Sequence, residues 1–431
     1  MVSASFRFLS KFVSGGQISA LKCPTFHTRT VGHHKQQNRN NMIKKFLTFI
    51  FIFGLISCDN NTDSIDYFGQ IPPDTIPEIF AKDKISVEGR FDYGISFSPK
   101  GDEVAFGVLS PPNYTGKIYY SKKDNNKWSE PILLNVFSGN SVYLPFFTPD
   151  GNYLLITQDK SETEIQLTDI GILERMDTGW GNLKIFSEPV SSYTREGSVC
   201  MTLDKTLYFS SNRKCETCLA DLYSCKLNKN GEYEKVEMIN ELSRDTDEES
   251  IFVSAKKEYA ILRSFVDPTI NNADLFISYR NVNDKWTKPQ LLDSAINTQF
   301  YEQRPFVSFE NRYLFFTRRI DDENGNMESD IYWVSTQKVF KPYVYNPLPD
   351  ITVQVGVNFE ISVPVDYFKD MDNKQLTLNI NKNDFDWLEF DNKNLKLSGL
   401  PTQVGDFELT FIAIDNHLNK TEDKIKIQVV K

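Results

Sequence analysis

Histidine is scarce in this sequence, which has four in 431 residues. His27, His33 and His34 lie close to the N-terminus, so that His417 is the only histidine in the rest of the chain. A Ser-His-Asp triad or a multi-histidine metal site therefore has almost no residues to be built from. The strings GxSxG, GxxxxGK[ST] and HExxH are also absent, so nothing in the sequence supports a serine hydrolase, a P-loop NTPase or a zincin.

Acidic residues are missing from the first 58 positions, which contain eight Lys or Arg. The rest of the chain has 40 basic and 58 acidic residues, a balance of -18. This charge disfavours nucleic acid as a partner, because contacts to phosphate need positive side chains. The simplest consequence of the acidity is solubility.

Long apolar runs are also lacking, and the run Phe46–Ile56 has only eleven residues, too few to span a bilayer as a helix. It follows Lys44-Lys45 and is typical of an exported signal peptide. The segment Leu55-Ile56-Ser57-Cys58 resembles a bacterial lipobox. The resemblance implies cleavage before Cys58, acylation of that cysteine, and a protein anchored at the outer membrane or cell surface. An ordinary secretory signal is the alternative, and both predict export.

The predicted boundaries around this signal follow from composition. Residues 42–57 are the expected lipoprotein signal peptide, and residues 58–76 are an expected polar, proline-bearing tether. Residues 1–41 are basic and show no periodicity, so we expect an extension upstream of a true start at Met42. An organellar transit peptide is the alternative interpretation of residues 1–41.

A motif that begins at Phe97 with the letters FSPKG recurs four more times. The spacings are 50, 54, 52 and 54 residues, taken between Phe97, Phe147, Met201, Val253 and Val307. Each copy is followed by a turn and a hydrophobic strand. A fixed period of about 50 residues with several short strands per period is typical of a β-propeller.

The repeats predict an all-β fold, with a propeller over residues 77–343. Five repeats favour five blades, and six stay possible. The last repeat lacks its outer strand, and Ile76–Phe80 matches the missing piece, so we expect the N-terminal strand to close the ring. The motifs FSPKG, FTPDG, Asp-Ile-Tyr and Trp-x-x-Pro resemble the TolB-type, WD-like propeller repeats of bacterial envelope proteins.

An acidic residue stands five positions before the start of four of the five repeats, namely Asp92, Glu196, Glu248 and Glu302. We expect these carboxylates at the mouth of the central channel, where they could bind a cation or a polyol. In a carbohydrate-active enzyme such carboxylates would serve as acid and base. The structural alternative is that each one caps the loop before its inner strand.

Four cysteines fall in the third repeat, and Cys215, Cys218 and Cys225 are the disulfide candidates among them. An exported protein favours disulfides, while a zinc site and a CxxC redox centre are the alternatives. Cys200 lies within the predicted inner strand and is expected to be a buried apolar side chain.

The segment 344–431 contains six or seven short alternating strands, which predict a β-sandwich. The strings Leu397-Ser398-Gly399-x-Pro401-Thr402 and Ala413-Ile414-Asp415 are among several that resemble the dystroglycan-type cadherin-like, or Ig-like, domain. This resemblance implies an extracellular adhesion or spacer module, in some members associated with calcium. The candidate calcium ligands are Asp370, Asp372, Asn373 and Asp415, with turn formation as the alternative role.

Taken together, these features favour a membrane-anchored envelope lipoprotein that acts as a non-enzymatic scaffold and binds a protein or a glycan. A surface carbohydrate-active hydrolase using the funnel carboxylates is the first alternative. An interaction platform for envelope assembly, by analogy with TolB, is the second. No cofactor other than calcium is expected.

Overall fold

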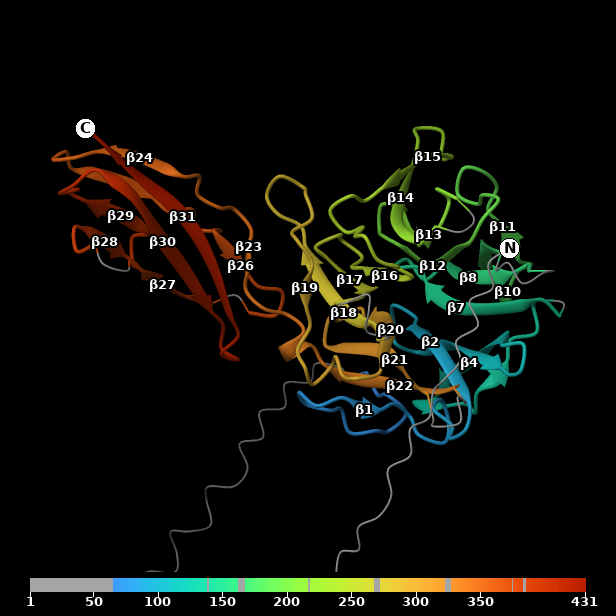
Figure 1. The fold of residues 1–431 in the computed structure, drawn as a ribbon. Helices are drawn as coiled ribbons and strands as arrows, with labels where there is room; N and C mark the ends of the chain where they lie inside the picture. Colours follow the sequence, from blue (N-terminus) through green and yellow to red (C-terminus); the bar gives the residue numbers. More distant parts are fainter. Residues whose placement is uncertain are drawn as a thin grey trace, which may run out of the picture. The chain divides into compact units, whose positions relative to one another are not determined.

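The computed structural model describes residues 65–137, 139–161, 167–215, 218–266, 272–321, 327–373, 375–382 and 385–431. The predicted signal peptide and Cys58 lie outside the described residues. Regular structure in the described part is almost entirely β (Figure 1), apart from the short 3-10 helix η1 (Thr336–Lys338). No helix within these ranges is long and apolar enough to cross a membrane.

Five antiparallel sheets follow one another along the chain, one for each sequence repeat. The first comprises β2 (Phe91–Phe97), β3 (Glu103–Ser110), β4 (Thr115–Asp124), β5 (Lys127–Trp128) and β6 (Ile132–Leu133). The second comprises β7 (Ser141–Phe147), β8 (Tyr153–Asp159), β9 (Thr168–Met176), β10 (Gly179–Trp180) and β11 (Lys184–Ile185). The third comprises β12 (Glu196–Met201), β13 (Leu207–Ser211), β14 (Asp221–Leu227) and β15 (Tyr233–Met238).

The fourth sheet comprises β16 (Ser250–Val253), β17 (Tyr259–Ser264), β18 (Asp274–Tyr279) and β19 (Gln290–Leu291). The fifth comprises β20 (Tyr301–Val307), β21 (Tyr313–Asp321) and β22 (Met327–Ser335). A parallel pair between Phe91 and Ser329 joins the last sheet to the first. The first strands β2, β7, β12, β16 and β20 gather around a common centre in Figure 1 and contact their neighbours in turn. The predicted propeller is therefore confirmed, with five blades in the described residues.

The N-terminal strand closes the ring as predicted. Strand β1 (Glu78–Ile79) pairs with β22, placing Glu78 opposite Trp333. The next amide, that of Phe80, donates a hydrogen bond of 2.8 Å to the carbonyl of Ile331. The ring of Phe80 is fully buried, 5.0 Å from that of Phe315 and 5.1 Å from that of Trp333. The last blade thus takes its fourth strand from the start of the domain, which pairs an edge that would otherwise be open.

The repeated FSPKG motif forms the hairpin between the first two strands of a blade. In the first blade Ser98 Oγ accepts the backbone N–H groups of Asp102 and Glu103 at 3.2 and 3.1 Å. The turn needs one residue with a positive φ angle, which is glycine in two blades and Lys or Asn in the other three. These residues are Gly101, Gly151, Lys205, Lys257 and Asn311. The hydroxyl and the left-handed turn residue give this motif a structural role, which is to form the hairpin turn.

Four of the five inner strands contain a bulge near their middle. The pairing register shifts between Asp92 and Ile95, Tyr143 and Phe146, Gly197 and Cys200, and Gln303 and Phe306. The bulged residues have left-handed backbone angles, with φ of 76° at Gly94, 54° at Leu144, 50° at Ser198 and 54° at Arg304. A bulge adds one residue to a strand and redirects the side chains on either side of it. The inner strands therefore present different residues before and after this point.

Phenylalanine rings from three inner strands meet on the axis of the propeller. Phe306 lies 5.7 Å from Phe252 and 6.4 Å from Phe146, measured between ring centres. The three rings line a cavity of only about 30 Å³. The central channel is therefore filled with apolar side chains at this level, as expected for a close-packed core.

The C-terminal module is a sandwich of two main sheets. One has the order β24 (Ile351–Gln354), β31 (Lys420–Val430), β30 (Gly405–Ile414) and β27 (Thr377–Asn381). The other has the order β25 (Phe359–Ser362), β29 (Lys396–Gly399) and β28 (Leu388–Asp391). A short pair, β23 (Tyr343–Val344) with β26 (Phe368–Lys369), stands at its start. The module has its own buried core, which includes Leu388, Leu397, Leu409 and Phe411.

Candidate functional site

A cavity of about 310 Å³ lies at the start of the inner strands, above the phenylalanine rings. All five blades contribute residues to its wall. The smaller apolar cavity shares Leu144, Ser198 and Arg304 with it and forms its inner end. A ligand would therefore enter from one side and meet a closed floor, which is the usual form of a small-molecule site.

Tyrosines from the first two blades form one wall of this cavity. They are Tyr93 on β2, Tyr114 in the turn before β4, and Tyr143 on β7. The rings of Tyr93 and Tyr143 are 6.2 Å apart, and the ring of Tyr114 packs on that of Phe91 at 5.7 Å. Such rings offer a broad apolar surface together with a hydroxyl group.

Charged residues from the third, fourth and fifth blades form the opposite wall, with Glu249 at its centre. Arg195 NH1 lies 2.7 Å from Glu249 Oε1, and Arg263 NH1 lies 3.0 Å from Oε2. Arg304 adds a longer contact of 3.6 Å to Oε2, and it also donates to the hydroxyl of Tyr93. The guanidinium of Arg304 lies 4.7 Å from the Tyr93 ring centre, so it links the charged wall to the aromatic wall.

The three arginines keep Glu249 ionised. Although burial acts in the opposite direction, Arg263, Arg195 and Arg304 together lower the pKa of Glu249 to about 2. Asp247, behind it, lies 3.6 Å from Arg195 and 3.7 Å from Arg263. The result is a fixed lattice of guanidinium and carboxylate groups, of which Arg195, Arg304 and Glu249 reach the cavity.

Polar groups complete the lining between the two walls. Asp159 accepts the backbone N–H of Ser161 at 2.8 Å, and both residues line the cavity. Thr157 Oγ1 is buried at the wall and has no hydrogen-bond partner in the described structure. The cavity thus combines aromatic faces with several fixed donors and acceptors.

The four predicted channel carboxylates lie elsewhere. Asp92, Glu196, Glu248 and Glu302 are fully buried, and none is among the described residues that line the cavity. Each accepts a backbone N–H from four or five residues earlier in the chain. Val87 donates to Asp92 at 3.0 Å and Thr298 to Glu302 at 3.0 Å. Ser192 donates to Glu196 at 2.9 Å and Arg244 to Glu248 at 3.1 Å.

Side-chain bonds occupy the remaining oxygens of these carboxylates. Ser211 donates to Glu196 at 2.9 Å, and Arg318 donates to Glu302 at 2.7 Å. Arg90 donates to Asp92 at 2.7 Å. This geometry supports the structural role for the four carboxylates, in which each one holds the loop that leads into its inner strand. The expectation that these four carboxylates lie at the channel mouth is wrong. The residues one or two positions further along the chain line the cavity instead.

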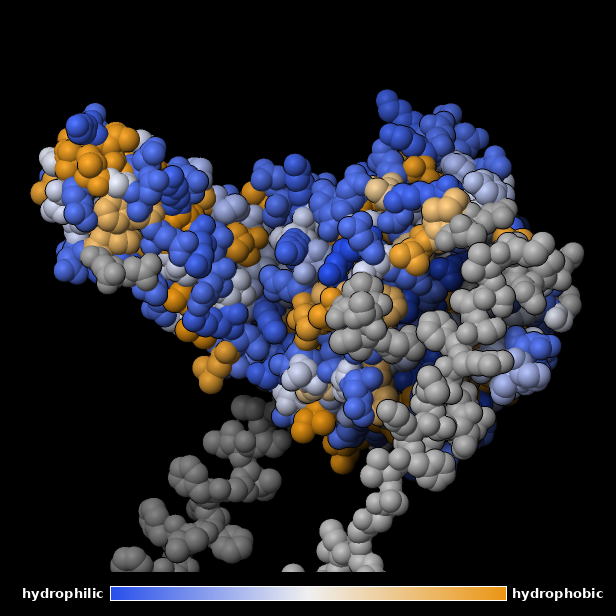
Figure 2. All heavy atoms as spheres, in the orientation of Figure 1, coloured by the Kyte–Doolittle hydropathy of each residue, from blue (hydrophilic) through white to orange (hydrophobic). Residues whose placement is uncertain are grey.

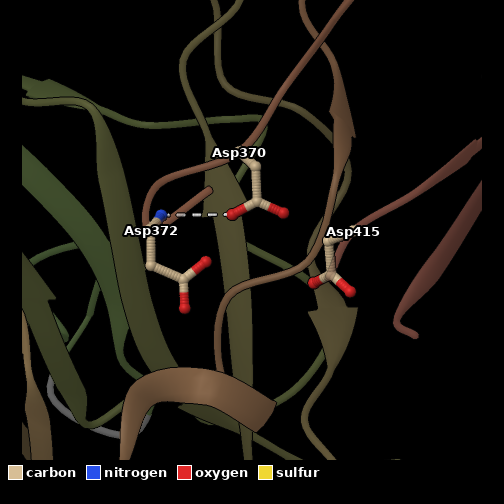
Figure 3. Close-up of side chains that lie close together, drawn as sticks. All are labelled: Asp370, Asp372 and Asp415. Atoms are coloured by element: carbon tan, nitrogen blue, oxygen red, sulfur yellow. Dashed lines mark hydrogen bonds between the residues drawn. The ribbon is translucent and has the colours of Figure 1, made fainter. Parts of the chain in front are cut away.

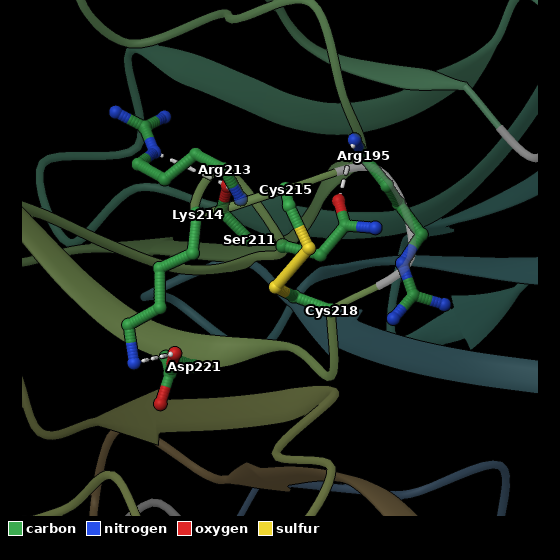
Figure 4. Close-up of a disulfide and its surroundings, with 8 residues drawn as sticks. Arg195, Ser211, Arg213, Lys214, Cys215, Cys218 and Asp221 are labelled. Atoms are coloured by element: carbon green, nitrogen blue, oxygen red, sulfur yellow. Dashed lines mark hydrogen bonds and ion pairs between the residues drawn. A yellow bond between two sulfur atoms is a disulfide. The ribbon is translucent and has the colours of Figure 1, made fainter.

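Two of the three candidate cysteines are bonded to each other in the structure. Cys215 and Cys218 form a disulfide in the loop between β13 and β14 (Figure 4). Cys225, the third candidate, is free and fully buried on β14, where its side chain packs into the blade. Cys200 is also free and buried, as predicted, and burial raises the pKa of its thiol to about 12.

Three of the four predicted calcium ligands come together in the sandwich. Figure 3 shows the carboxylates of Asp370, Asp372 and Asp415 pointing toward one another, and one oxygen of each lies within 4.8 Å of the others. Burial and the neighbouring Asp372 raise the pKa of Asp370 to about 7. Asp370 Oδ2 is buried without a hydrogen-bond partner in the described structure. Asn373 is nearly buried and lines the same hollow as Asp370 and Asp415.

These donors fit a calcium ion by their chemistry, since calcium takes carboxylate and amide oxygens. Asp415 is the most restrained of them. Its Oδ1 accepts the N–H groups of His417 and Asn419 at 2.9 and 2.7 Å, which also supports the turn-forming role. Both interpretations of this residue are therefore compatible with the structure.

The face seen in Figure 2 is mostly hydrophilic, and hydrophobic residues occur on it in small groups. Scattered apolar residues of this kind are normal on a soluble domain.

Comparison with known families gives one match. Residues 338–430 match the family described as the alpha-dystroglycan third Ig-like domain. This confirms the predicted dystroglycan-type module, while the TolB-type assignment of the propeller stays a prediction. The comparison with curated proteins finds no match.

Comparison with solved structures finds matches of low identity and low TM-score. An endo-arabinase from Bacteroides thetaiotaomicron has 13% identity and a TM-score of 0.39, covering 61% of this chain and 96% of that one. A family 117 glycoside hydrolase from Zobellia galactanivorans has 10% identity and a TM-score of 0.38, covering 60% and 90%.

A putative alpha-galactosidase from Bacteroides fragilis has 23% identity and a TM-score of 0.17, covering 21% of this chain and 18% of that one. This chain therefore spans less than a fifth of that protein's length. At such identities and TM-scores, no activity is carried over to this chain.

Proposed function

We propose that the protein binds a glycan in the propeller cavity. The carrying observation is the two-sided wall, with tyrosine rings opposite a fixed lattice of arginine and carboxylate groups. A sugar ring has one apolar face, which suits an aromatic wall, and several hydroxyls, which suit fixed charged donors and acceptors. The charges of the lattice are nearly balanced, which favours a neutral sugar over a strongly charged one.

Calorimetric titration with neutral oligosaccharides tests this function. The panel contains di- to tetrasaccharides of arabinose, xylose, galactose and glucose. We expect at least one series to bind, and Tyr114→Ala to weaken it about tenfold through loss of stacking. Tyr193→Ala is the matched control, because Tyr193 is 66% exposed and does not line the cavity. No binding by any member, or equal losses in both variants, would refute the proposal.

Hydrolysis of the bound glycan is a second candidate function. The observation that favours it is that Asp159 and Glu249 both line the cavity, and glycoside hydrolysis uses a pair of carboxylates. Glu249 is held ionised by its arginines, so it could act as base or nucleophile but not as the proton donor. Asp159 would have to supply the proton.

The same oligosaccharides separate binding from hydrolysis. Release of reducing ends that disappears in Asp159→Asn and in Glu249→Gln would establish an enzyme. Intact binding with no reducing ends released over a day would exclude it and leave a binding protein.

We also propose that the sandwich module binds calcium through Asp370, Asp372, Asn373 and Asp415. A bound ion would remove the repulsion that raises the pKa of Asp370. Calcium at about 100 times its dissociation constant should stabilise the module by about 3 kcal/mol, seen as a higher melting temperature. Asp370→Asn should abolish the shift, whereas Asp386→Asn, an exposed residue of the same module, should not. An identical melting temperature in EDTA and in calcium would eliminate the site.

A further inference from the structure

We infer that the Cys215–Cys218 disulfide is a redox-sensitive clasp that positions Arg195 and Asp247 beside the propeller cavity. The clasp itself does not depend on the function proposed above. Its effect on ligand binding rests on the proposed carbohydrate-binding function. Its basis is that both ends of the disulfide loop are bonded to members of the charged lattice around Glu249.

The first end of the loop is fixed to Arg195. The backbone N–H of Arg195 donates to Asn212 Oδ1 at 2.9 Å, and Asn212 N–H donates back to the Arg195 carbonyl at 3.2 Å. The Cys215 N–H donates to the Asn212 carbonyl at 3.1 Å, and Cys218 N–H to the Cys215 carbonyl at 3.0 Å. Figure 4 shows the disulfide and Arg195 together. Asn212 therefore connects the disulfide to the backbone of a cavity residue.

The second end of the loop is fixed to Asp247. The Ala220 N–H donates to Asp247 Oδ1 at 2.8 Å, and the Ala220 carbonyl accepts the Glu248 N–H at 2.9 Å. Asp247 lies 3.6 Å from Arg195 NH2, and Arg195 NH1 lies 2.7 Å from Glu249. The two cysteines therefore lie in sequence between a residue bonded to Arg195 and a residue bonded to Asp247, and the disulfide is a covalent link between these two attachments.

The local chemistry suits exchange with a thiol. Both cysteines are partly exposed, so a small thiol can reach the sulfur atoms. The other described cysteines, Cys200 and Cys225, are free and buried, so they are poor competitors for this exchange.

The reaction with a small thiol is a balanced two-electron exchange. One thiolate attacks a sulfur of the disulfide, which forms a mixed disulfide and releases the other protein thiolate to take up a proton. A second small thiol displaces the remaining protein sulfur. Two small thiols become one oxidised disulfide, and Cys215 and Cys218 each gain a hydrogen. The opened loop then no longer restrains Arg195 and Asp247.

Hydrogen exchange of the full-length protein tests the clasp without any ligand. We expect dithiothreitol to speed exchange about threefold or more in peptides covering residues 194–197 and 246–250, while peptides of the first blade stay unchanged. The Cys215→Ser/Cys218→Ser protein should exchange fast with or without the reductant. In Asn212→Ala the response at residues 194–197 should be lost, and Asn212→Asp, which keeps an oxygen acceptor, should restore it. Equal exchange in oxidised and reduced wild type would overturn the inference.

Titration with arabinotriose distinguishes the clasp from the proposed function. If the sugar binds the oxidised protein, we expect about fivefold weaker binding after reduction and no change in the double serine variant. Equal affinity in both redox states would overturn the regulatory role. Absence of binding in both states, together with the expected exchange response, would refute binding of this sugar and leave the clasp supported. Unchanged circular dichroism after reduction is the control for folding.

Discussion

Glu248 is a residue at which the protein should sense pH through its stability. It has no exposed surface, and it accepts hydrogen bonds from the Arg244 N–H at 3.1 Å and the Ser264 hydroxyl at 2.9 Å. Burial outweighs these bonds and raises the pKa of Glu248 from 4.5 to about 7. Because the folded pKa is the higher one, the contribution of Glu248 is fully present below pH 4.5 and is lost as the pH rises through about 7.

Replacing Glu248 with Gln should therefore flatten the pH dependence. The free energy of unfolding of the wild type should fall by up to about 1.4 kcal/mol per pH unit in this range from this group alone. Urea unfolding at several pH values between 4.5 and 7.5 measures the slope in both proteins. Glu241→Gln, at an exposed position of the same segment, is the control. An identical slope in wild type and Glu248→Gln would show that this carboxyl does not titrate differently on folding.

The position of Glu248 also explains what the sequence could not reveal about the cavity. In four blades the recurring acid has the same structural role, which is to hold the loop before the inner strand by hydrogen bonds. Residues that face a ligand differ between blades, as Tyr93, Glu249 and Arg304 do. Adjacent residues of a strand point to opposite faces, so an error of one position in the sequence assignment places a buried residue in the cavity wall, or the reverse. A bulge shifts this alternation once more. A search for variable positions next to the recurring acid, and next to the equivalent position of the second repeat, would have found Tyr93, Tyr143 and Glu249.

At the scale of elements, closure of the ring by β1 should carry a large share of the propeller's stability. Phe80 is fully buried against rings of the first and last blades, including Phe97 at 5.8 Å and Phe315 at 5.0 Å. Phe80→Ala should cost about 3–5 kcal/mol of unfolding free energy, from lost burial and the cavity it leaves. Ile76→Ala, at a residue 73% exposed just before the strand, should change it by less than about 0.5 kcal/mol. Chemical denaturation of both variants measures this, and a small loss for Phe80→Ala would mean that the ring holds without its closing strand.

The elements were more predictable than the contacts between them. Repeat spacing, turn residues and strand patterns were enough for the four strands of each blade and for the origin of the closing strand near Ile76–Phe80. The disulfide partner of Cys215 was less certain, because spacing alone does not show that the side chain of Cys225 points into the blade. The aromatic and charged walls depend on which strands become neighbours around the ring, and no local pattern contains that information.

At the scale of the whole molecule, the strand that closes the propeller directly follows the predicted tether. Residues 58–76 would connect a lipid on Cys58 to β1, which is hydrogen-bonded to β22. An anchor at this point would hold the ring by an element of its last blade. The C-terminal module is attached at the same end of that blade, because the N–H of Ser335, the last residue of β22, donates to the carbonyl of Asp74 before β1 at 2.9 Å. Both attachments would leave the loops around the cavity unconstrained by the anchor.

The lipid anchor itself is the prediction with the widest consequence, because it sets where the protein acts. In a bacterial host, Cys58→Ser should abolish incorporation of labelled palmitate and move the protein from the membrane fraction to the soluble exported fraction. Its melting temperature is the control for folding. Cys23→Ser is the matched control, since that cysteine lies upstream of the predicted start at Met42 and should have no effect. A Cys58→Ser protein that stays membrane-bound would show that another part of the chain holds it there, and a Cys23→Ser protein with altered localisation would show that translation begins upstream of Met42.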